Sequence, residues 1–253
     1  MLEEFLRAEH LHKVFSSGAK KFTAVDDVSL SLKQGEKLAI IGESGSGKTT
    51  VARIIARLIE PDGGRIILGG KDITKAKGRE LRQVYDVMQM VFQNPVESFD
   101  PRWTLGDSIC EGLMNHGYAR KEADKECRKL LQMCGLEEDF ARRYPYEVSG
   151  GQCQRAAIAR ALALGPKLLI LDEATSALDV TVQVEVLSLL DRLHRKLSMS
   201  YLFICHDIAL VQDFCHRVMV MYQGKVVEEG TCDQVISNPQ QEYTKRLIDS
   251  VLQ

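Results

Sequence analysis

Gly42-Glu43-Ser44-Gly45-Ser46-Gly47-Lys48-Thr49 is the stretch that decides the fold. It matches the phosphate-binding loop pattern in full, with two glycines at fixed offsets followed by a lysine and a hydroxyl residue. The apolar run from Lys37 to Ile41 predicts a buried strand that enters the loop. Beyond Thr50, apolar residues at helical spacing predict a helix that leaves it: Val51, Ile54, Ile55, Leu58 and Ile59. Strand, loop and helix together predict a nucleoside triphosphate site.

The chemistry of such a loop depends on its backbone. Unpaired N–H groups and the positive end of the helix dipole face the phosphates, and glycines let the backbone approach where a Cβ would collide. Lys48 is expected to bridge the β- and γ-phosphates, and the hydroxyl of Thr49 to bind Mg²⁺. Thr50 completes the predicted nucleotide-binding set. A glycine-rich turn that matches by chance is the alternative, and the flanking strand and helix disfavour it.

Composition narrows the class of protein. The chain has 253 residues, 45% of them hydrophobic and 27% charged, and a net charge of −2. The charges are spread along the chain, so we expect no nucleic-acid partner. No apolar run approaches the roughly 20 residues of a membrane helix, and the N-terminus predicts no signal peptide. Any membrane role is therefore expected to come through a partner.

Seven cysteines lie at irregular spacings with no CxxC pair. That pattern argues against zinc and against an iron–sulfur cluster. It favours reduced, mostly buried thiols of a cytosolic protein.

Alternating and apolar runs predict further strands before residue 95: Glu9 to Phe15, Ala24 to Leu32, Arg65 to Leu68 and Met88 to Phe92. Phe15 lies upstream of the phosphate loop, where an aromatic ring could stack on a base, but periodicity alone favours a core residue. Pro95 stops the last of these strands, which leaves Gln93 at a junction where it can point into a site.

Strand signals vanish from Thr104 to Leu164, and helical stretches follow at roughly 104–115, 120–134 and 152–164. We expect an all-helical insert. Ser149, Gly150, Gly151 and Gln152 precede the last helix, with Ser149 placed as its N-cap. The glycines would leave N–H groups exposed at a positive helix end, which makes a second anion site. An ordinary capped helix explains this pattern equally well.

Two more strands end in polar residues. The apolar run Leu168 to Leu171 predicts a buried parallel strand that delivers Asp172 and Glu173 at its carboxyl end. Ligands of open α/β sheets bind at that edge, so these carboxylates are expected beside the phosphate loop, with Asp172 holding Mg²⁺. The run Tyr201 to Cys205 likewise ends at His206.

The remaining segments follow these strands. Ser176 to Asp179 is a polar turn that starts a helix, Arg217 to Tyr222 and Lys225 to Glu229 predict a hairpin, and Asn238 to Leu252 predicts a short amphipathic helix.

Taken together, the motifs resemble those of the ATP-binding cassette (ABC) ATPases over nearly the whole chain. The family's order is phosphate loop, Gln loop, signature, Walker B strand with glutamate, D-loop and switch histidine. The corresponding stretches here are Gly42–Thr49, Gln93, Ser149–Gln152, Leu168–Glu173, Ser176–Asp179 and His206. Six elements in one order make a chance match implausible. By this resemblance Phe15 becomes the adenine-stacking aromatic, reversing the preference for a core residue.

The resemblance implies an α/β fold, with a P-loop NTPase (RecA-like) core, an antiparallel β subdomain and an inserted all-helical subdomain. Residues 1–253 would form one nucleotide-binding domain. Residues 1–94 and 165–253 would make the core with its β subdomain and 95–164 the helical insert, and 231–253 would be a short tail.

The resemblance also implies a mechanism. Two ATP molecules would be sandwiched in a head-to-tail dimer, each between one subunit's phosphate loop and the other's signature, with Asp179 close by. Glu173 would orient or deprotonate the attacking water, His206 would contact the γ-phosphate, and Gln93 would join the Mg²⁺ site to the insert. Cofactors are therefore ATP and Mg²⁺, with Thr49, Gln93 and Asp172 at the metal. Permease docking is expected on the Gln93 loop and on Phe99 to Trp103.

Within the family, three stretches resemble the dipeptide, oligopeptide and nickel importers: Val91–Pro95, Phe99–Arg102, and Asn238-Pro239 with Tyr243-Thr244. The implied partners are two transmembrane permease subunits, a second ATPase subunit (a copy or a paralogue) and, indirectly, an extracytoplasmic binding protein. The chain would lie on the cytoplasmic face of the membrane. An ABC ATPase of translation or DNA maintenance is the alternative, although this chain lacks a second cassette and a long coiled-coil insert. A small-molecule P-loop kinase would lack the signature and the switch histidine.

Overall fold

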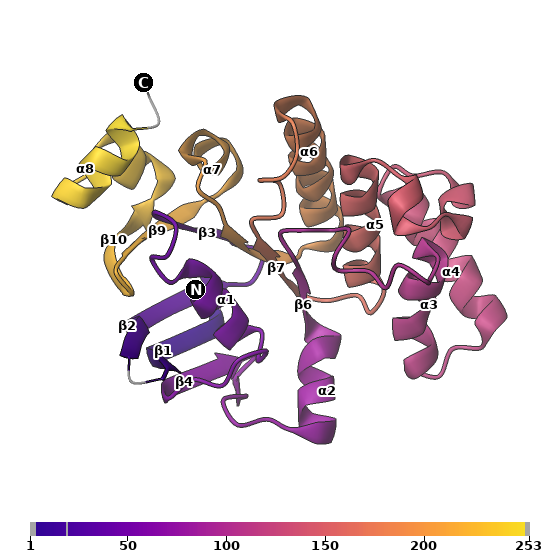
Figure 1. The fold of residues 1–253 in the computed structure, drawn as a ribbon, viewed down its shortest axis with the longest axis horizontal. Helices are drawn as coiled ribbons and strands as arrows, with labels where there is room; N and C mark the ends of the chain where they lie inside the picture. The colour runs from indigo at the N-terminus through magenta and orange to yellow at the C-terminus, as the bar shows by residue number, and fades with distance from the viewer. Residues whose placement is uncertain (1–3, 19, 251–253) are drawn as a thin grey trace. The chain divides into compact units, whose positions relative to one another are not determined.

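A computed structural model describes residues 4–18 and 20–250, which form two compact units (Figure 1). Unit 1 comprises the described residues up to Tyr85 together with those from Ser198 onward. Unit 2 is the continuous segment Asp86–Leu197. The mixture of sheets and helices confirms the predicted α/β class. The narrower insert expected over 95–164 stays a prediction.

Unit 1 contains an antiparallel sheet with the strand order β2-β1-β4-β5. Its strands are β1 (Glu4–Ser17), β2 (Lys20–Lys33), β4 (Gly63–Leu68) and β5 (Lys71–Asp72). The first two are longer than the alternating runs predicted, because bulges interrupt their alternation. At one such bulge His10 and Asp27 both have positive φ, and His10 Nδ1 lies 2.7 Å from Asp27 Oδ1.

The second group of strands in unit 1 surrounds the strand that leads into the phosphate loop. That strand, β3 (Lys37–Ile41), is fully buried and pairs in parallel with β8 (Ser200–Ile204) and β9 (Arg217–Tyr222). A hairpin joins β9 to β10 (Lys225–Thr231). These strands and the hairpin agree with the sequence prediction.

Helices complete unit 1. They are α1 (Lys48–Ile55), α7 (Ile208–Phe214), α8 (Glu242–Asp249) and a π-helical turn over Asp233–Ser237. Within the predicted tail helix, only the α8 segment is α-helical among the described residues. A helix missed from the sequence is α2 (Gly78–Val87), which contains the boundary between the units. Val84 is the only buried residue of this helix, so its sequence lacks the stripe of apolar residues from which a helix is predicted.

Unit 2 pairs two parallel strands, β6 (Met88–Val91) and β7 (Leu168–Asp172). Its helices are α3 (Leu105–Asn115), α4 (Arg120–Met133), α5 (Gly150–Leu162) and α6 (Val180–Leu197). Short 3-10 turns cover Glu138–Arg142 and Pro145–Glu147. The three helices expected between 104 and 164 are present, with α5 beginning two residues earlier than predicted.

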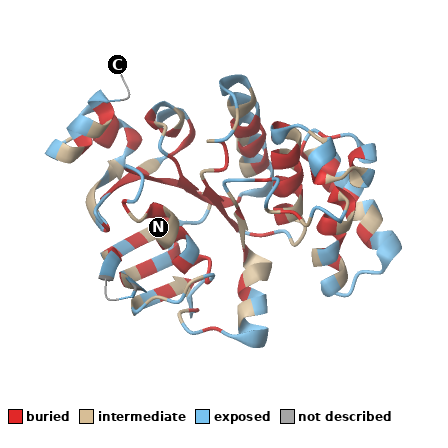
Figure 2. Ribbon diagram, viewed as in Figure 1, coloured by how far each residue is buried: buried red, intermediate tan, exposed pale blue. Residues whose placement is uncertain are grey.

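Burial follows the strands (Figure 2). Every residue of β3, β7 and β8 is buried, as the apolar runs within them predict, and the polar residue at one end of each strand (Lys37, Asp172 and Ser200) is buried too. All seven cysteines are buried and free, in agreement with the expectation of reduced core thiols. Across residues 4–18 and 20–250, no helix has the length and apolar character needed to cross a bilayer.

Candidate functional site

The phosphate loop in unit 1 requires glycine at both of its fixed positions. Gly42 has φ 145° and Gly47 has φ 104°, values that side-chain-bearing residues rarely adopt. A Cβ on Gly42 would lie 2.2 Å from the carbonyl oxygen of Met221, and one on Gly47 would lie 2.3 Å from that of Ala24. The loop is therefore packed closely against backbone, and its shape depends on these glycines.

Lys48 lies inside the loop. Its side chain is buried, and Nζ donates to the carbonyl oxygens of Gly42 and Glu43 at 2.8 Å each. Gly47 supplies no capping side chain to the start of α1. Ser46 Oγ is buried and finds no hydrogen-bond partner among the described residues. A held ammonium, an uncapped helix start and an unpaired hydroxyl suit a polyphosphate.

Two contacts brace the loop from outside, and sequence reasoning missed both. The amide of Gly224, in the β9–β10 turn, donates to the carbonyl oxygen of Ser46 at 3.0 Å. The amide of Glu43 donates to the hydroxyl of Tyr243, on α8, at 3.0 Å. Tyr243 belongs to a tail motif noted in the sequence, but nothing in that motif indicates a contact 200 residues away.

His206 and Phe15 both lie in unit 1. Ile40 pairs with Ile204 in the parallel ladder, and His206 follows β8 by two residues just as Gly42 follows Ile40. The exposed His206 therefore lies at the same sheet edge as the loop. Phe15 is 41% exposed, with Lys13 Nζ 5.7 Å from its ring centroid, so it is a surface residue rather than a core one.

In unit 2 the structure brings together two of the residues predicted to be catalytic. Gln93 Nε2 donates to Glu173 Oε2 at 2.7 Å and lies 3.5 Å from Ser176 Oγ. Ser176 Oγ in turn donates to the backbone carbonyl of Glu173 at 2.9 Å. This cluster fixes the Glu173 carboxylate to the start of the Gln93 loop.

The backbone around Glu173 is unusual. The residue has φ 47°, in the left-handed region that costs a non-glycine residue free energy. Asp172, just before it, ends β7 and is only 2% exposed. Their expected position beside the phosphate loop joins residues of different units and stays a prediction.

The signature stretch forms a reciprocal cap on α5. Ser149 Oγ accepts from the Gln152 amide at 3.3 Å, and Gln152 Oε1 accepts from the Ser149 amide at 3.0 Å. Gly150 is exposed, whereas Gly151 is buried against α6: a Cβ there would lie 2.4 Å from Val182 Cγ1. The capped-helix interpretation is thus correct, and it leaves the anion-site interpretation untested.

Asp179 caps the neighbouring helix. Its Oδ1 accepts from the amide of Val182 at 3.1 Å, so this D-loop carboxylate fixes the start of α6. The side chain of the same residue, Val182, packs against Gly151 on α5, where it leaves no space for a Cβ. Signature and D-loop are therefore mechanically joined through the first turn of α6.

Phe99 was expected on the docking surface, and that expectation is wrong. The ring is 4% exposed and lies under the guanidinium of Arg160, whose Cζ is 4.2 Å from the ring centroid. Arg160 also donates to Ser98, to the carbonyl oxygen at 2.6 Å and to Oγ at 2.9 Å. Trp103 is 40% exposed and remains available for a partner.

The cysteines near the motifs are packing residues. Burial raises the pKa of the Cys153 thiol, next to the signature, to about 11, so it stays protonated at neutral pH. Cys205 is also buried, and its sulfur accepts from the Asp207 amide at 3.3 Å. Neither residue has the exposed, electropositive setting of a reactive thiol.

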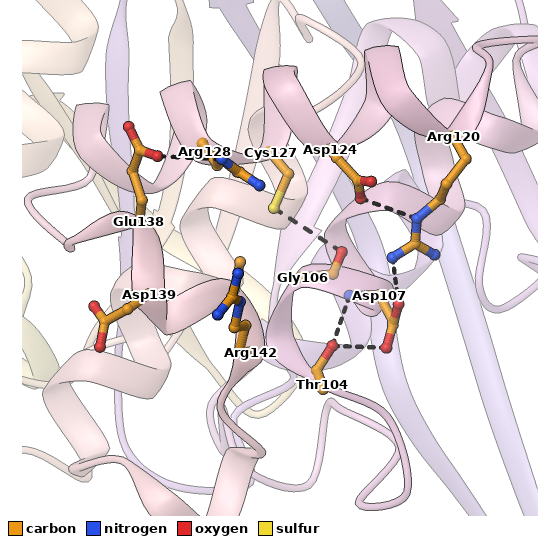
Figure 3. A pocket seen from close by; sticks show the side chains of 11 residues that line it. Thr104, Gly106, Asp107, Arg120, Asp124, Cys127, Arg128, Glu138, Asp139 and Arg142 are labelled. Atoms are coloured by element: carbon orange, nitrogen blue, oxygen red, sulfur yellow. Dashed lines mark hydrogen bonds and ion pairs between the residues drawn. The ribbon is translucent and has the colours of Figure 1, made fainter.

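A hollow of about 510 Å³ lies in unit 2 among α3, α4 and the turn Glu138–Arg142 (Figure 3). Its charged lining is largely paired. Arg120 contacts Asp107 at 2.7 Å and Asp124 at 2.9 Å, and Arg128 lies 3.6 Å from Glu138.

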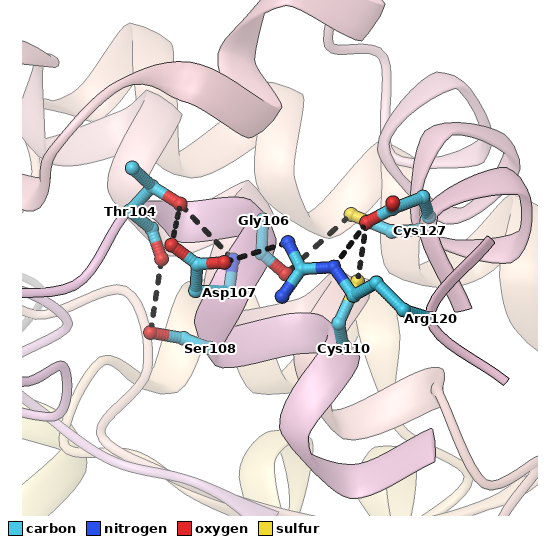
Figure 4. A network of polar contacts seen from close by, with 8 residues as sticks. Thr104, Gly106, Asp107, Ser108, Cys110, Arg120 and Cys127 are labelled. Carbon is cyan, nitrogen blue, oxygen red and sulfur yellow. Dashed lines mark hydrogen bonds and ion pairs between the residues drawn. The ribbon is translucent and has the colours of Figure 1, made fainter. Parts of the chain in front are cut away.

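The polar network continues into the helices beside the hollow (Figure 4). Asp107 accepts from Thr104 Oγ1 at 2.7 Å, and the thiol of Cys110 lies 3.6 Å from Asp124 Oδ1. The Cys110–Asp124 contact and the Arg120–Asp107 pair tie α3 to α4, and the hollow contains none of the predicted site residues. We interpret the network as structural.

Comparison with known proteins gives a consistent family. The family model described as ABC transporter matches residues 25–176. The chain is 47% identical to the glutathione import ATP-binding protein GsiA of Pectobacterium atrosepticum, over 90% of this chain and 37% of GsiA. It is 45% identical to the oligopeptide transport ATP-binding protein OppF of Salmonella typhimurium, over 92% and 70%. It is 41% identical to the dipeptide transport ATP-binding protein DppF of Lactococcus lactis, over 98% and 81%.

Solved structures agree. A dimeric, post-hydrolysis state of the ATP-binding cassette MJ0796 bound to ADP and Pi has a TM-score of 0.82 and 30% identity, covering 90% of this chain and 98% of that one. The cbiO1 protein of Clostridium perfringens, part of the ABC transporter complex cbiONQ, also has a TM-score of 0.82, with 28% identity over 93% and 92%. The chain thus spans most of these cassettes and 37% of GsiA.

Proposed function

Because the chain belongs to the ABC transporter family, we propose that it is the ATP-hydrolysing subunit of a membrane importer. The observation that carries the proposal is the phosphate loop, in which Gly42 and Gly47 tolerate no Cβ and the carbonyl oxygens of Gly42 and Glu43 hold the ammonium of Lys48. The ammonium would neutralise phosphate charge, and the N-terminus of α1, which no side chain caps, would face the phosphates. The names of the relatives supply the transport context.

ATP binding is assigned to the loop and its surroundings. Lys48 would keep the carbonyl oxygen of Gly42 as one partner of its ammonium and turn its other N–H groups to the β- and γ-phosphates. The first amides of α1 would hold the β-phosphate. The exposed ring of Phe15 would stack on the adenine. By the family resemblance Thr49, Asp172 and Gln93 would hold Mg²⁺, and the ion would neutralise phosphate charge.

Hydrolysis is assigned to the cluster around Glu173. Phosphoryl transfer depends on positioning and charge neutralisation, so the protein's main task is to place a water in line with the γ-phosphate. The carboxylate of Glu173 would accept a proton from that water or orient the water. Gln93, which donates to the carboxylate at 2.7 Å, would hold the carboxylate in place. His206, at the sheet edge that carries the loop, would contact the γ-phosphate.

Transport requires partners. We propose that two subunits, copies of this chain or paralogues, close on ATP, with the Ser149–Gln152 signature of one against the loop of the other. Differential affinity for ATP and ADP would drive closure and release. Two permease subunits would convert that cycle into alternating access at the cytoplasmic face of the membrane, and an extracytoplasmic binding protein would deliver the cargo.

The cargo class follows from the relatives. Their names specify glutathione, oligopeptides and dipeptides, all of which contain peptide bonds, so we propose peptides as the cargo of the importer. Nickel and metal chelates rest on the sequence resemblance alone. The alternative of an ATPase of translation or DNA maintenance finds no support, because these relatives are transport proteins.

Two substitutions test the proposal in the full chain. Glu173→Gln keeps the shape and can keep the bond to Gln93, so it should retain ATP affinity, lose turnover by roughly 10²–10⁴-fold and accumulate closed dimers. Lys48→Ala should instead weaken ATP binding itself. Single-turnover phosphate release and titration with a fluorescent ATP analogue separate the two. Near-normal turnover of Glu173→Gln would remove Glu173 from the catalytic role.

A further inference from the structure

The tail helix α8 reaches the phosphate loop through one hydroxyl. Tyr243 lies in the first turn of α8, and its hydroxyl accepts the amide N–H of Glu43 at 3.0 Å. Burial raises the pKa of the Tyr243 phenol, so the hydroxyl stays neutral at physiological pH and offers a lone pair to the amide. This contact joins two segments that the nucleotide assignment leaves unconnected.

The bonded amide belongs to a peptide unit with a second partner. The N–H of Glu43 and the carbonyl of Gly42 are the two ends of one planar peptide group. The carbonyl end accepts from Lys48 Nζ at 2.8 Å, while the N–H end donates to Tyr243. Because the group is rigid, the tyrosine sets the direction in which the carbonyl points at the lysine. Hydrogen bonding at the N–H also polarises the carbonyl and strengthens its hold on the ammonium.

Glycine at position 42 makes this restraint necessary. Gly42 has φ 145° and lacks the Cβ that would restrict its backbone, so the peptide that follows can rotate more freely than it could after a residue with a side chain. The Tyr243 hydroxyl restrains that rotation at the N–H end of the peptide, while Lys48 contacts its carbonyl end.

The helix that carries Tyr243 is itself held firmly. The Glu228 carboxylate, on β10, accepts the amides of Gln240 and Gln241 at 2.7 and 3.1 Å, just before α8 begins. The ring of Tyr243 packs on that of Tyr222, at the end of β9, with 4.2 Å between centroids. Both anchors belong to the β9–β10 hairpin of unit 1, beside which α8 lies (Figure 1).

We propose that Tyr243 is a positioning residue for the phosphate loop: through the Gly42–Glu43 peptide it orients Lys48 for the phosphates of ATP. The proposal rests on the nucleotide site proposed above and adds a residue on the tail to it. The hydroxyl acts before and during binding of ATP and takes no part in the hydrolytic step. Its loss should therefore raise the Kd for ATP and leave kcat nearly unchanged.

The experiment compares two Tyr→Phe variants of the same aromatic pair in the full chain. Tyr243→Phe removes the hydroxyl that contacts the loop and keeps the ring contact with Tyr222. Tyr222→Phe is the matched control, because its hydroxyl accepts from the side chain of Gln223, at 3.1 Å, instead of from the loop. A fluorescent ATP analogue with Mg²⁺ gives Kd, steady-state hydrolysis gives kcat, and thermal unfolding checks the fold.

Tyr243→Phe should raise the Kd about three- to tenfold, the range of a lost neutral hydrogen bond, whereas Tyr222→Phe should stay within about twofold of the unmodified chain. A double-mutant cycle with Lys48→Ala tests the route. If the tyrosine acts through the lysine, Tyr243→Phe should change the Kd of the Lys48→Ala protein by less than about twofold.

Three results would overturn the proposal: a Kd for Tyr243→Phe within twofold of the unmodified chain, an equal rise for Tyr222→Phe, or an undiminished effect in the Lys48→Ala background. A fall in kcat at constant Kd would likewise contradict it. Failure of the proposed function looks different, because the unmodified chain would then bind no ATP analogue at all.

Discussion

Replacing Phe99 by alanine should destabilise unit 2 rather than remove a docking contact. The ring is 4% exposed and is covered by the Arg160 guanidinium at 4.2 Å. Truncating a buried phenylalanine costs about 3–5 kcal/mol, part of it for the cavity that remains. Arg160 keeps its two bonds to Ser98, at 2.6 and 2.9 Å, so it cannot collapse fully into the space. We therefore expect Phe99→Ala to lower the free energy of unfolding by about 3–5 kcal/mol.

That loss should be visible in thermal unfolding. For a chain of this size each kcal/mol lowers the Tm by about 2–4 °C, so Phe99→Ala should melt about 6–20 °C below the unmodified protein. Trp103→Ala is the control: its side chain is 40% exposed, so its Tm should fall by no more than about 4 °C. A Tm for Phe99→Ala within about 2 °C of the unmodified protein would refute the packing role and return the ring to the docking surface.

Three other substitutions follow from the site. Gly151→Ala places a methyl 2.4 Å from Val182 Cγ1 and should cost about 1–3 kcal/mol in the free energy of unfolding, recovered in part by adding Val182→Ala. Gln93→Ala removes the donor to Glu173 and should slow single-turnover hydrolysis by roughly 10²-fold at unchanged ATP affinity; unchanged hydrolysis would release Gln93 from that role. Burial opposes ionisation of Glu228, yet the amides that donate to it hold its pKa below the usual range. The ionised carboxylate therefore stabilises the folded protein fully above pH 4.5, and this contribution to the free energy of unfolding declines as the pH falls through the lowered pKa. Denaturant unfolding between pH 7 and pH 3 should show this loss, and Glu228→Gln should flatten that part of the profile.

The Trp103→Ala variant also carries the revised docking prediction. If the permease contacts this exposed ring, transport by the assembled importer should fall while ATP hydrolysis by the isolated subunit stays near normal. Cross-linking from position 103 to a permease subunit would give direct support, and full transport by the variant would contradict the contact.

Local sequence patterns were sufficient to predict the elements in which a chemical motif lies next to a regular apolar pattern. The loop around Lys48 has a fixed spacing of glycines, and the apolar runs before Asp172 and His206 can only be buried strands. Position at the carboxyl end of such a strand then predicts where the polar residue lies. The strands themselves are confirmed, because they depend on few neighbours in sequence, whereas the position of Asp172 beside the loop stays a prediction.

What the sequence could not indicate depends on pairing between distant segments. Tyr243 reaches Glu43 only because the β9–β10 hairpin carries α8 to the loop. The burial of Phe99 depends on Arg160, which lies 61 positions later in the sequence. Because arginine is charged, its residue type does not predict that it covers a buried ring. The bulge at His10 breaks alternation in β1, and a period-two pattern fails where one residue is inserted.

The division into a continuous unit 2 and a split unit 1 determines the order in which the protein can assemble on the ribosome. β3 is made early, but its parallel neighbours β8 and β9 emerge roughly 160 residues or more later. At about 5–20 residues per second, the apolar strand waits unpaired for about ten seconds or longer, while unit 2 is completed behind it. A nascent chain therefore contains the whole phosphate-loop sequence long before it contains the strands that hold the loop in shape. Nucleotide binding becomes available only after β8 and β9 have been made, and during the delay β3 is the apolar segment that a chaperone would protect.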